Sequence, residues 1–345
     1  MKRLLLASVA IAAAAAFAVA PAQAKKPYQM RIGMVTINDS NHLLAKAFKR
    51  ELEARAPGRI EVSVFPAAQL GKIPRQIEGL QFGTQAAFHI PPGFFLGINK
   101  AFMVSDAPGL FDSIDHQTLA MNHPSFRKKF FTLADKKGMV GNVVWGAGDT
   151  SIATLRPMKK LSDFRGRKIR VLATPLERAV MAKMGATGVP MPYSEVLPAL
   201  TQKVIDGVRS AVLVMYPSKF YTAAKNITLT GMGHISCWQA LSTAWMKTLP
   251  ADLRALIVQV GKEQTIQASK WATELTASSE KAWAKVGTVH RLPAADQAKL
   301  AELVAPIGNE ILANDPATKE MYLLLKAAVA ETRGKPLSTV AEYLK

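Results

Sequence analysis

The chain has 345 residues, of which 49% are hydrophobic and 20% are charged, so it can bury a sizeable core and is neither disordered nor collagen-like. Its 44 lysines and arginines outnumber 25 aspartates and glutamates, which gives a formal charge of +19 and directs attention to anionic partners. The single cysteine, Cys237, excludes an internal disulfide and a zinc site built on several thiolates.

The first 24 residues have the pattern of a secretory signal peptide. Lys2 and Arg3 precede an uncharged stretch over residues 4–20, and Ala22-Gln23-Ala24 supplies small residues for cleavage. A membrane anchor would need about 20 spanning residues and a stop-transfer flank. We therefore expect cleavage after Ala24 and an exported, periplasmic product. Residue 25 is a lysine, so no lipid anchor on a cysteine is expected.

The first part of the expected mature chain alternates strand and helix patterns. Short apolar or alternating segments predict strands, and apolar residues at helical spacing between caps and Gly or Pro stops predict helices. In chain order the expected elements are a strand over 30–36, a helix over 41–55, a strand over 59–65, a helix over 74–82 and an apolar segment over 86–91. This alternation predicts an α/β sheet whose ligand crevice lies outside the carboxyl ends of the strands.

The same pattern continues through the middle of the chain and then becomes helical. The expected elements are strands over 139–145, 168–172 and 208–215, an extended piece over 189–192, and helices over 175–184 and 195–204. A proline-free segment predicts one or two long helices over 251–284, and two further helices begin near Ala294 and Ala317. Gly148 is expected in a turn.

Common catalytic motifs are absent from the sequence. The six histidines include no His-Glu-x-x-His pair, and there is no Gly-x-Ser-x-Gly elbow, Walker loop or Gly-x-Gly-x-x-Gly turn. We expect no cofactor and no metal. A periplasmic enzyme with Asp149 or His89 as general base is the alternative of a different class, but nothing in the sequence places either group against a substrate. Cys237 is expected to be packed rather than nucleophilic.

The densest basic stretch runs from Arg156 to Arg170 and contains Asp163 as its only acid. No aromatic-rich strand or helix-turn-helix pattern accompanies it, so nucleic acid is not expected as a partner. Arg170 differs from its neighbours because Ile169 and Val171 place it in an apolar strand, where an unpaired charge would be costly. We expect it to meet a structural carboxylate or the carboxylate of a ligand held by its bidentate fork.

Several segments, in order, resemble the solute-binding subunits of tripartite ATP-independent periplasmic (TRAP) transporters of the dicarboxylate-receptor (DctP) type. The first is Gly58-Arg59-Ile60-Glu61-Val62 followed by Phe65-Pro66-Ala67-Ala68-Gln69-Leu70-Gly71, and the second runs from Asp163 to Val171. The third comprises Gly185-Ala186, Pro190 to Val196, Ala199-Leu200 and Val204 to Val208, and Ser218 to Tyr221 with Leu229-Thr230-Gly231 extends it. The resemblance covers nearly all of the chain after the signal peptide.

The resemblance implies an α/β fold, a two-domain periplasmic binding protein (type II-like), with a ligand cleft between the domains and long C-terminal helices. Domain I would comprise residues 25–147 and about 236–275, and domain II residues 148–235 and about 276–345. Arg170 falls on the family's carboxylate-clamping arginine and Tyr193 on its ligand-facing aromatic ring. Further wall candidates follow strand ends, at Thr36, Pro92, Phe94, Trp145 and Trp238.

The sequence departs from the family pattern at three places. A second arginine of many members would fall on Asp149 or Thr150, Ser210 stands where an amide is frequent, and the segment over 86–92 lacks an acidic residue. A second ligand carboxylate would thus lack its usual partners and would face Asp149. We therefore expect a monocarboxylate whose far end is apolar, hydroxylated or cationic. Recruitment of Arg209 or Arg178 would instead preserve binding of a C4-dicarboxylate.

The expected function is capture of a small organic acid by cleft closure and its delivery to TRAP membrane subunits, without bond chemistry. The alternatives are a ligand-sensing periplasmic receptor for a signalling partner and a dicarboxylate-specific TRAP receptor.

Overall fold

The computed structural model describes residues 26–345, so the expected signal peptide over 1–24 lies outside the described residues. The strands are β1 (Tyr28–Met34), β2 (Ile60–Phe65), β3 (Ala87–Ile90), β4 (Met139–Thr154), β5 (Lys168–Val171), β6 (Thr187–Pro190), β7 (Gly207–Ala211), β8 (Asn226–Ser242) and β9 (Thr288–Arg291). The helices are α1 (Ser40–Arg55), α2 (Ile73–Phe82), α3 (Ile114–Asn122), α4 (Pro124–Phe130), α5 (Pro175–Lys183), α6 (Tyr193–Thr201), α7 (Val212–Met215), α8 (Thr243–Thr248), α9 (Ala251–Trp283), α10 (Ala294–Val304), α11 (Pro316–Thr332) and α12 (Val340–Tyr343).

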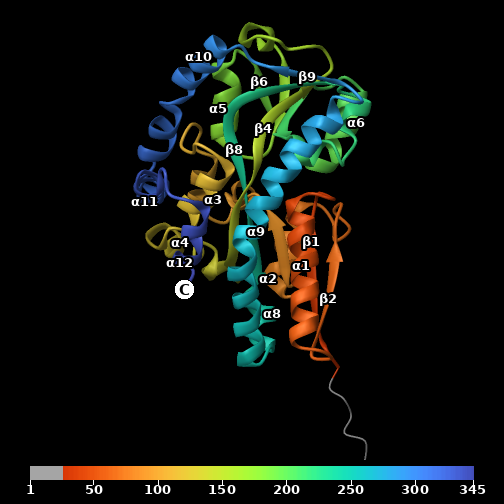
Figure 1. Ribbon diagram of the computed structural model, residues 1–345, viewed down its shortest axis with the longest axis vertical. Coiled ribbons are helices and arrows are strands. Elements are labelled where there is room, and N and C mark those ends of the chain that lie inside the picture. Colours follow the sequence, from red (N-terminus) through yellow and green to blue (C-terminus); the bar gives the residue numbers. More distant parts are fainter. Residues whose placement is uncertain (1–25) are drawn as a thin grey trace, which may run out of the picture.

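The strands form one mixed sheet in the order β2-β1-β3-β8-β4-β7-β5-β6, with β9 paired to β8. β1, β2 and β3 are parallel to one another, and so are β5, β6 and β7, so each set presents its carboxyl ends at one edge. The long antiparallel pair β4 and β8 joins the two sets. The molecule is therefore a two-domain α/β protein whose domains share two continuous strands (Figure 1).

Helices pack beside the sheet in both halves of the molecule. α1 lies beside β1 and β2 in the lower half of Figure 1, where α8 lies near α2. α5 and α6 lie in the upper half, and the single helix α9 runs from the lower half into the upper one. α1 and α9 pack with the first strands around a core that includes Phe48, Trp145 and Ile257. The described residues contain no helix that combines the length and the apolar character needed to cross a membrane.

The sequence did not predict the two long strands correctly. The expected strand over 139–145 continues to Thr154, and Gly148, expected in a turn, lies inside β4 at a register shift between Gly146 and Gly148. β8 was not predicted at all, although it is the longest strand. The expected strand over 208–215 ends at Ala211, where the short helix α7 begins. The expected helix over 251–284 is confirmed as the single helix α9.

Replacement of Gly148 should destabilise the fold strongly. Its φ is +138°, and a Cβ there would lie 2.7 Å from Leu213 Cδ2 and 2.8 Å from the Cβ of Ala211. Gly148→Ala therefore adds overpacking to backbone strain, and we expect a loss of about 2 to 4 kcal/mol in the free energy of unfolding. Gly58→Ala is the control, because Gly58 has φ +69° but a Cβ added to it would meet no atom within 4 Å. Urea unfolding that gave equal losses for both variants would contradict this assignment.

Candidate functional site

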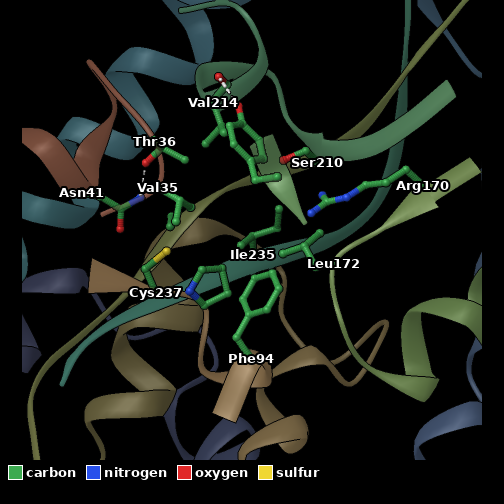
Figure 2. Close-up of a pocket in the computed structure, with 13 residues that line it drawn as sticks. Val35, Thr36, Asn41, Phe94, Arg170, Leu172, Ser210, Val214, Ile235 and Cys237 are labelled. Atoms are coloured by element: carbon green, nitrogen blue, oxygen red, sulfur yellow. Dashed lines mark hydrogen bonds between the residues drawn. The ribbon is translucent and has the colours of Figure 1, made fainter. Parts of the chain in front are cut away.

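A cavity of about 40 Å³ lies at the carboxyl ends of both sets of parallel strands. Thirteen residues line it: Val35, Thr36, Asn41, Pro91, Phe94, Ala147, Arg170, Leu172, Tyr193, Ser210, Val214, Ile235 and Cys237. Figure 2 shows Asn41 and Thr36 on one side and Arg170, Ser210 and Leu172 on the other. Residues from both halves of the chain therefore enclose one space, as the position outside the strand ends predicted.

Arg170 supplies the only charge among the residues that line this cavity. It is 1% exposed, and its Nε and Nη2 donate to the carbonyl oxygen of Met191 at 3.0 and 2.9 Å. This carbonyl fixes the plane of the guanidinium, whose remaining N–H groups can serve the cavity. Burial lowers the pKa of Arg170 to about 10, so the side chain stays charged at neutral pH.

Arg170 is buried without a carboxylate partner. Among residues 26–345 no aspartate or glutamate forms an ion pair with it. The nearby Glu177 is bound elsewhere: it pairs with Arg209, and its Oε2 accepts from the backbone N–H groups of Leu172 and Ala173 at 2.8 and 3.1 Å. A buried cation that has only a carbonyl partner favours an anion beside it.

Tyr193 contributes a fixed aromatic wall. Its hydroxyl lies 2.6 Å from Ser218 Oγ and 3.1 Å from the carbonyl oxygen of Val214, and the guanidinium carbon of Arg170 lies 5.9 Å from its ring centroid. Burial raises the pKa of the phenol, so it remains neutral. The ring therefore packs beside the cation while its hydroxyl is held by Val214 and Ser218.

The opposite wall is built around Asn41, at the start of α1. Its Nδ2 donates to Asp39 Oδ2 at 2.8 Å and to Thr36 Oγ1 at 3.3 Å, while its Oδ1 has no partner in the described part of the chain. Its carbonyl oxygen lies 2.9 Å from Nδ1 of the buried His89. Desolvation lowers the pKa of His89 to about 4, so this ring is neutral and Nδ1–H donates to the carbonyl.

Five of the ten site residues expected from the sequence line this cavity, namely Thr36, Phe94, Arg170, Tyr193 and Ser210. The structure places the other five elsewhere. Trp145 and Trp238 are fully buried in the core, Trp145 donating to Ser40 Oγ at 3.2 Å and Trp238 packing against Phe95 and Phe102. Pro92 is buried next to the lining residue Pro91.

Asp149 and Thr150 line a different cavity of about 260 Å³. Asp149 Oδ1 lies 2.6 Å from His234 Nδ1, and Thr150 Oγ1 donates to the carbonyl oxygens of Met232 and Gly233. The expectation that Asp149 faces a ligand carboxylate beside Arg170 is therefore wrong for this arrangement, because these residues do not share the cavity of Arg170.

The two cations named as possible partners for a second carboxylate do not line the cavity either. Arg209 precedes Ser210 on β7, so its side chain leaves the opposite face of the strand and pairs with Glu177. Arg178 is exposed on α5. Sequence reasoning missed the lining residues Asn41, Ile235 and Cys237, since β8 was not predicted and Asn41 was assigned only to the start of a helix.

A groove of about 780 Å³ adjoins the cavity and shares Phe94 and Leu172 with it. Its walls come from α2 on one side and from Pro190, Met191 and Pro192 on the other. Lys72, before α2, forms an ion pair of 2.7 Å with Glu195 of α6. Both side chains are largely exposed, so this contact between the two halves contributes no more than about 1 kcal/mol.

Cys237 should react slowly with thiol reagents in the folded protein. The side chain is 2% exposed, and burial, followed by the charge of Asp39, raises the pKa of its thiol. Because Cys237 is the only cysteine of the chain, disulfide exchange with a chromogenic reagent at pH 8 reports on this site alone. We expect labelling at least tenfold slower in buffer than in denaturant; equal rates would show that the cavity is open to solvent.

The chain is similar in sequence to periplasmic binding proteins. Residues 33–315 match the model of the bacterial extracellular solute-binding protein family 7, DctP. The chain is 28% identical over 292 residues to the C4-dicarboxylate-binding periplasmic protein DctP of Rhodobacter capsulatus, covering 83% of this chain and 86% of that protein. It is 27% identical over 255 residues to the 2,3-diketo-L-gulonate-binding periplasmic protein YiaO of Escherichia coli, covering 73% and 76%.

Solved structures of TRAP periplasmic solute-binding proteins are also similar to this chain. A TRAP periplasmic solute-binding protein from Shewanella oneidensis with bound succinate superposes with a TM-score of 0.81 at 26% identity, covering 88% of this chain and 99% of that one. A TRAP solute-binding protein from Desulfovibrio salexigens with bound orotic acid shares the fold at 24% identity, with a TM-score of 0.82 and coverage of 88% and 99%. The chain therefore belongs to the DctP family of TRAP-type periplasmic solute-binding proteins.

Proposed function

We propose that this chain, after export and cleavage behind Ala24, captures a small monocarboxylate at Arg170 and delivers it to TRAP membrane subunits. The observation that carries the proposal is the buried, charged Arg170 in a cavity that contains no carboxylate. Relatives of the family bind organic acids, succinate among them. The role is binding and release, and no bond is made or broken.

The monocarboxylate is favoured by what surrounds the single cation. Apart from Arg170, the cavity presents neutral side chains, and most of them are apolar, including Val35, Phe94, Leu172 and Ile235. A second carboxylate enclosed there would lose its hydration without gaining a cationic partner, at a cost of several kcal/mol. Repulsion by Asp149 plays no part in this preference. The preference depends instead on Arg209 being neutralised by Glu177.

The strands that connect the two domains could also act as the hinge by which the ligand cavity opens and closes. We infer that domain I comprises residues 25–147 and about 236–275, and domain II residues 148–235 and about 276–345. The boundaries after residues 147 and 235 fall at the register shift of β4, where Gly146 pairs with Ser236 and Gly148 with Ile235, and the one near residue 275 lies within α9. Bending there would open the cavity along the neighbouring groove, and a ligand that contacts both walls would stabilise the closed form through its higher affinity for it.

Loss of Arg170 should abolish ligand binding. We expect Arg170→Ala to show no ligand-induced rise in melting temperature, and Arg170→Lys to bind at least tenfold more weakly, because an ammonium does not reproduce two parallel hydrogen bonds. Isothermal titration with a panel of monocarboxylates measures the affinities, starting from the unaltered chain from residue 25. Arg178→Ala, which removes an exposed arginine of the same domain, is the control. Unfolding curves establish that Arg170→Lys is folded; wild-type affinity in that folded variant would overturn the clamp assignment.

The ligand class is tested separately, with 2-oxo-4-methylpentanoate against succinate. We expect the branched monocarboxylate to bind at least tenfold more tightly, because succinate would place its second carboxylate against apolar walls. Asp149→Asn should leave both affinities unchanged, since Asp149 lies in the other cavity. Tighter binding of succinate would refute the monocarboxylate preference while leaving carboxylate capture at Arg170 intact.

A further inference from the structure

The basic stretch noted in the sequence is not used by the ligand cavity, and it gathers at the far end of domain II. The parallel strands β5, β6 and β7 begin there, and α5 and α6 end there, so the edge is opposite to the one that carries Arg170. The yellow-green loops of this region lie at the top of Figure 1. We call this surface the basic end; its cations are Arg156, Lys159, Lys160, Arg165, Arg167, Lys168, Lys183 and Lys203.

The cations of the basic end lack acidic partners. In the described part of the chain none of them takes part in an ion pair, whereas many other lysines and arginines do. The carboxylates that stand beside them are turned to the backbone. Asp163 accepts from the N–H groups of Lys159 and Lys160, Asp206 from that of Lys168, and Asp296 from that of Leu161, at 2.7 to 3.1 Å. These bonds fix the loops and leave the cationic heads exposed to solvent, except for that of Arg167, which is half-buried.

An exposed apolar residue stands within this surface. Val204 follows Lys203 in the turn after α6, and 55% of its surface is exposed, which is unusual for a large hydrophobic residue of this chain. Lys203 has a φ of +59° in this turn, which ends the helix as the N–H of Val204 donates to the carbonyl oxygen of Ala199 at 2.9 Å. Cations around an exposed aliphatic side chain are suited to the boundary between phosphate headgroups and acyl chains. A small inorganic anion or a fully polar polyanion would leave Val204 in contact with water.

We propose that the basic end is an adsorption surface for anionic phospholipid bilayers. Three strands about 4.8 Å apart, with the two helix ends beside them, spread the cations over a width that suits a plane of charge rather than a single small anion. Juxtaposed lysines and arginines are attracted additively by anionic headgroups, and this attraction is screened by salt. Because the surface lies at the opposite strand ends from Arg170, adsorption leaves the ligand cavity facing the solution.

Co-sedimentation with lipid vesicles tests the proposal on the chain from residue 25. Vesicles of phosphatidylglycerol and phosphatidylcholine in equal amounts should sediment the protein at low salt, whereas pure phosphatidylcholine should not. The triple variant Lys159→Glu, Lys160→Glu, Arg165→Glu should reduce the partition coefficient on anionic vesicles roughly tenfold or more. Val204→Ser should reduce it by a smaller factor, and 0.5 M salt should abolish it.

The matched control is Lys128→Glu, Lys136→Glu, Lys137→Glu, which changes the net charge equally at three exposed lysines of α4 and the segment that follows it. This variant should retain most of the binding. An equal loss in both triple variants would overturn the proposal in favour of unspecific attraction by net charge. Absence of sedimentation with anionic vesicles would also overturn it, as would binding to soluble polyglutamate that exceeds binding to vesicles at equal charge. Unfolding curves of each variant confirm the fold, because all the substituted side chains are exposed.

Discussion

The buried charge of Arg170 is the constraint on which the site depends. An arginine in an apolar strand can be kept only if its N–H groups are satisfied, and Met191 supplies one carbonyl for two of them. The rest are left to a cavity whose lining, among residues 26–345, includes no carboxylate. Because the compensating anion must come from outside, the same residue that destabilises the domain on its own gives it an affinity for an organic acid.

The ion pair between Arg209 and Glu177 keeps the carboxylate of Glu177 away from Arg170. Glu177 would be the natural partner of Arg170, yet it is held by Arg209 and by two backbone N–H groups. Burial and then the charge of Glu177 raise the pKa of Asp106 to about 7, so ionisation of a second carboxylate beside Glu177 is disfavoured. The pair thus withholds one cation from the ligand and one carboxylate from Arg170.

The order of the first strands and helices and the candidate role of Arg170 could be predicted from the sequence, because both depend on residues close together in the chain. The strand and helix order over residues 26–90 follows from periodicity and caps, and Arg170 stood out because Ile169 and Val171 enclosed it in a buried strand. The predictions for β8, Gly148 and Trp238 were wrong or missing because these features depend on strand pairing, which the periodicity of the sequence does not reveal. Two glycines, Gly231 and Gly233, interrupt the alternation of β8 after Thr230, and Gly148 gave a turn signal inside a bulged strand. Trp238 faces the core, and Cys237, one residue before it, faces the cavity.

The two ends of β5 therefore hold cations in opposite physical states. At the cavity one guanidinium is desolvated, oriented by a carbonyl and little affected by salt; at the other end many hydrated heads act through a field that decays over about 8 Å at physiological ionic strength. Salt should thus change how often an anion, whether solute or surface, encounters this domain, while retention of a carboxylate in the closed cavity is set by Arg170. Net charge governs encounter and the buried arginine governs selection, so the strongly basic composition alone could not identify the ligand.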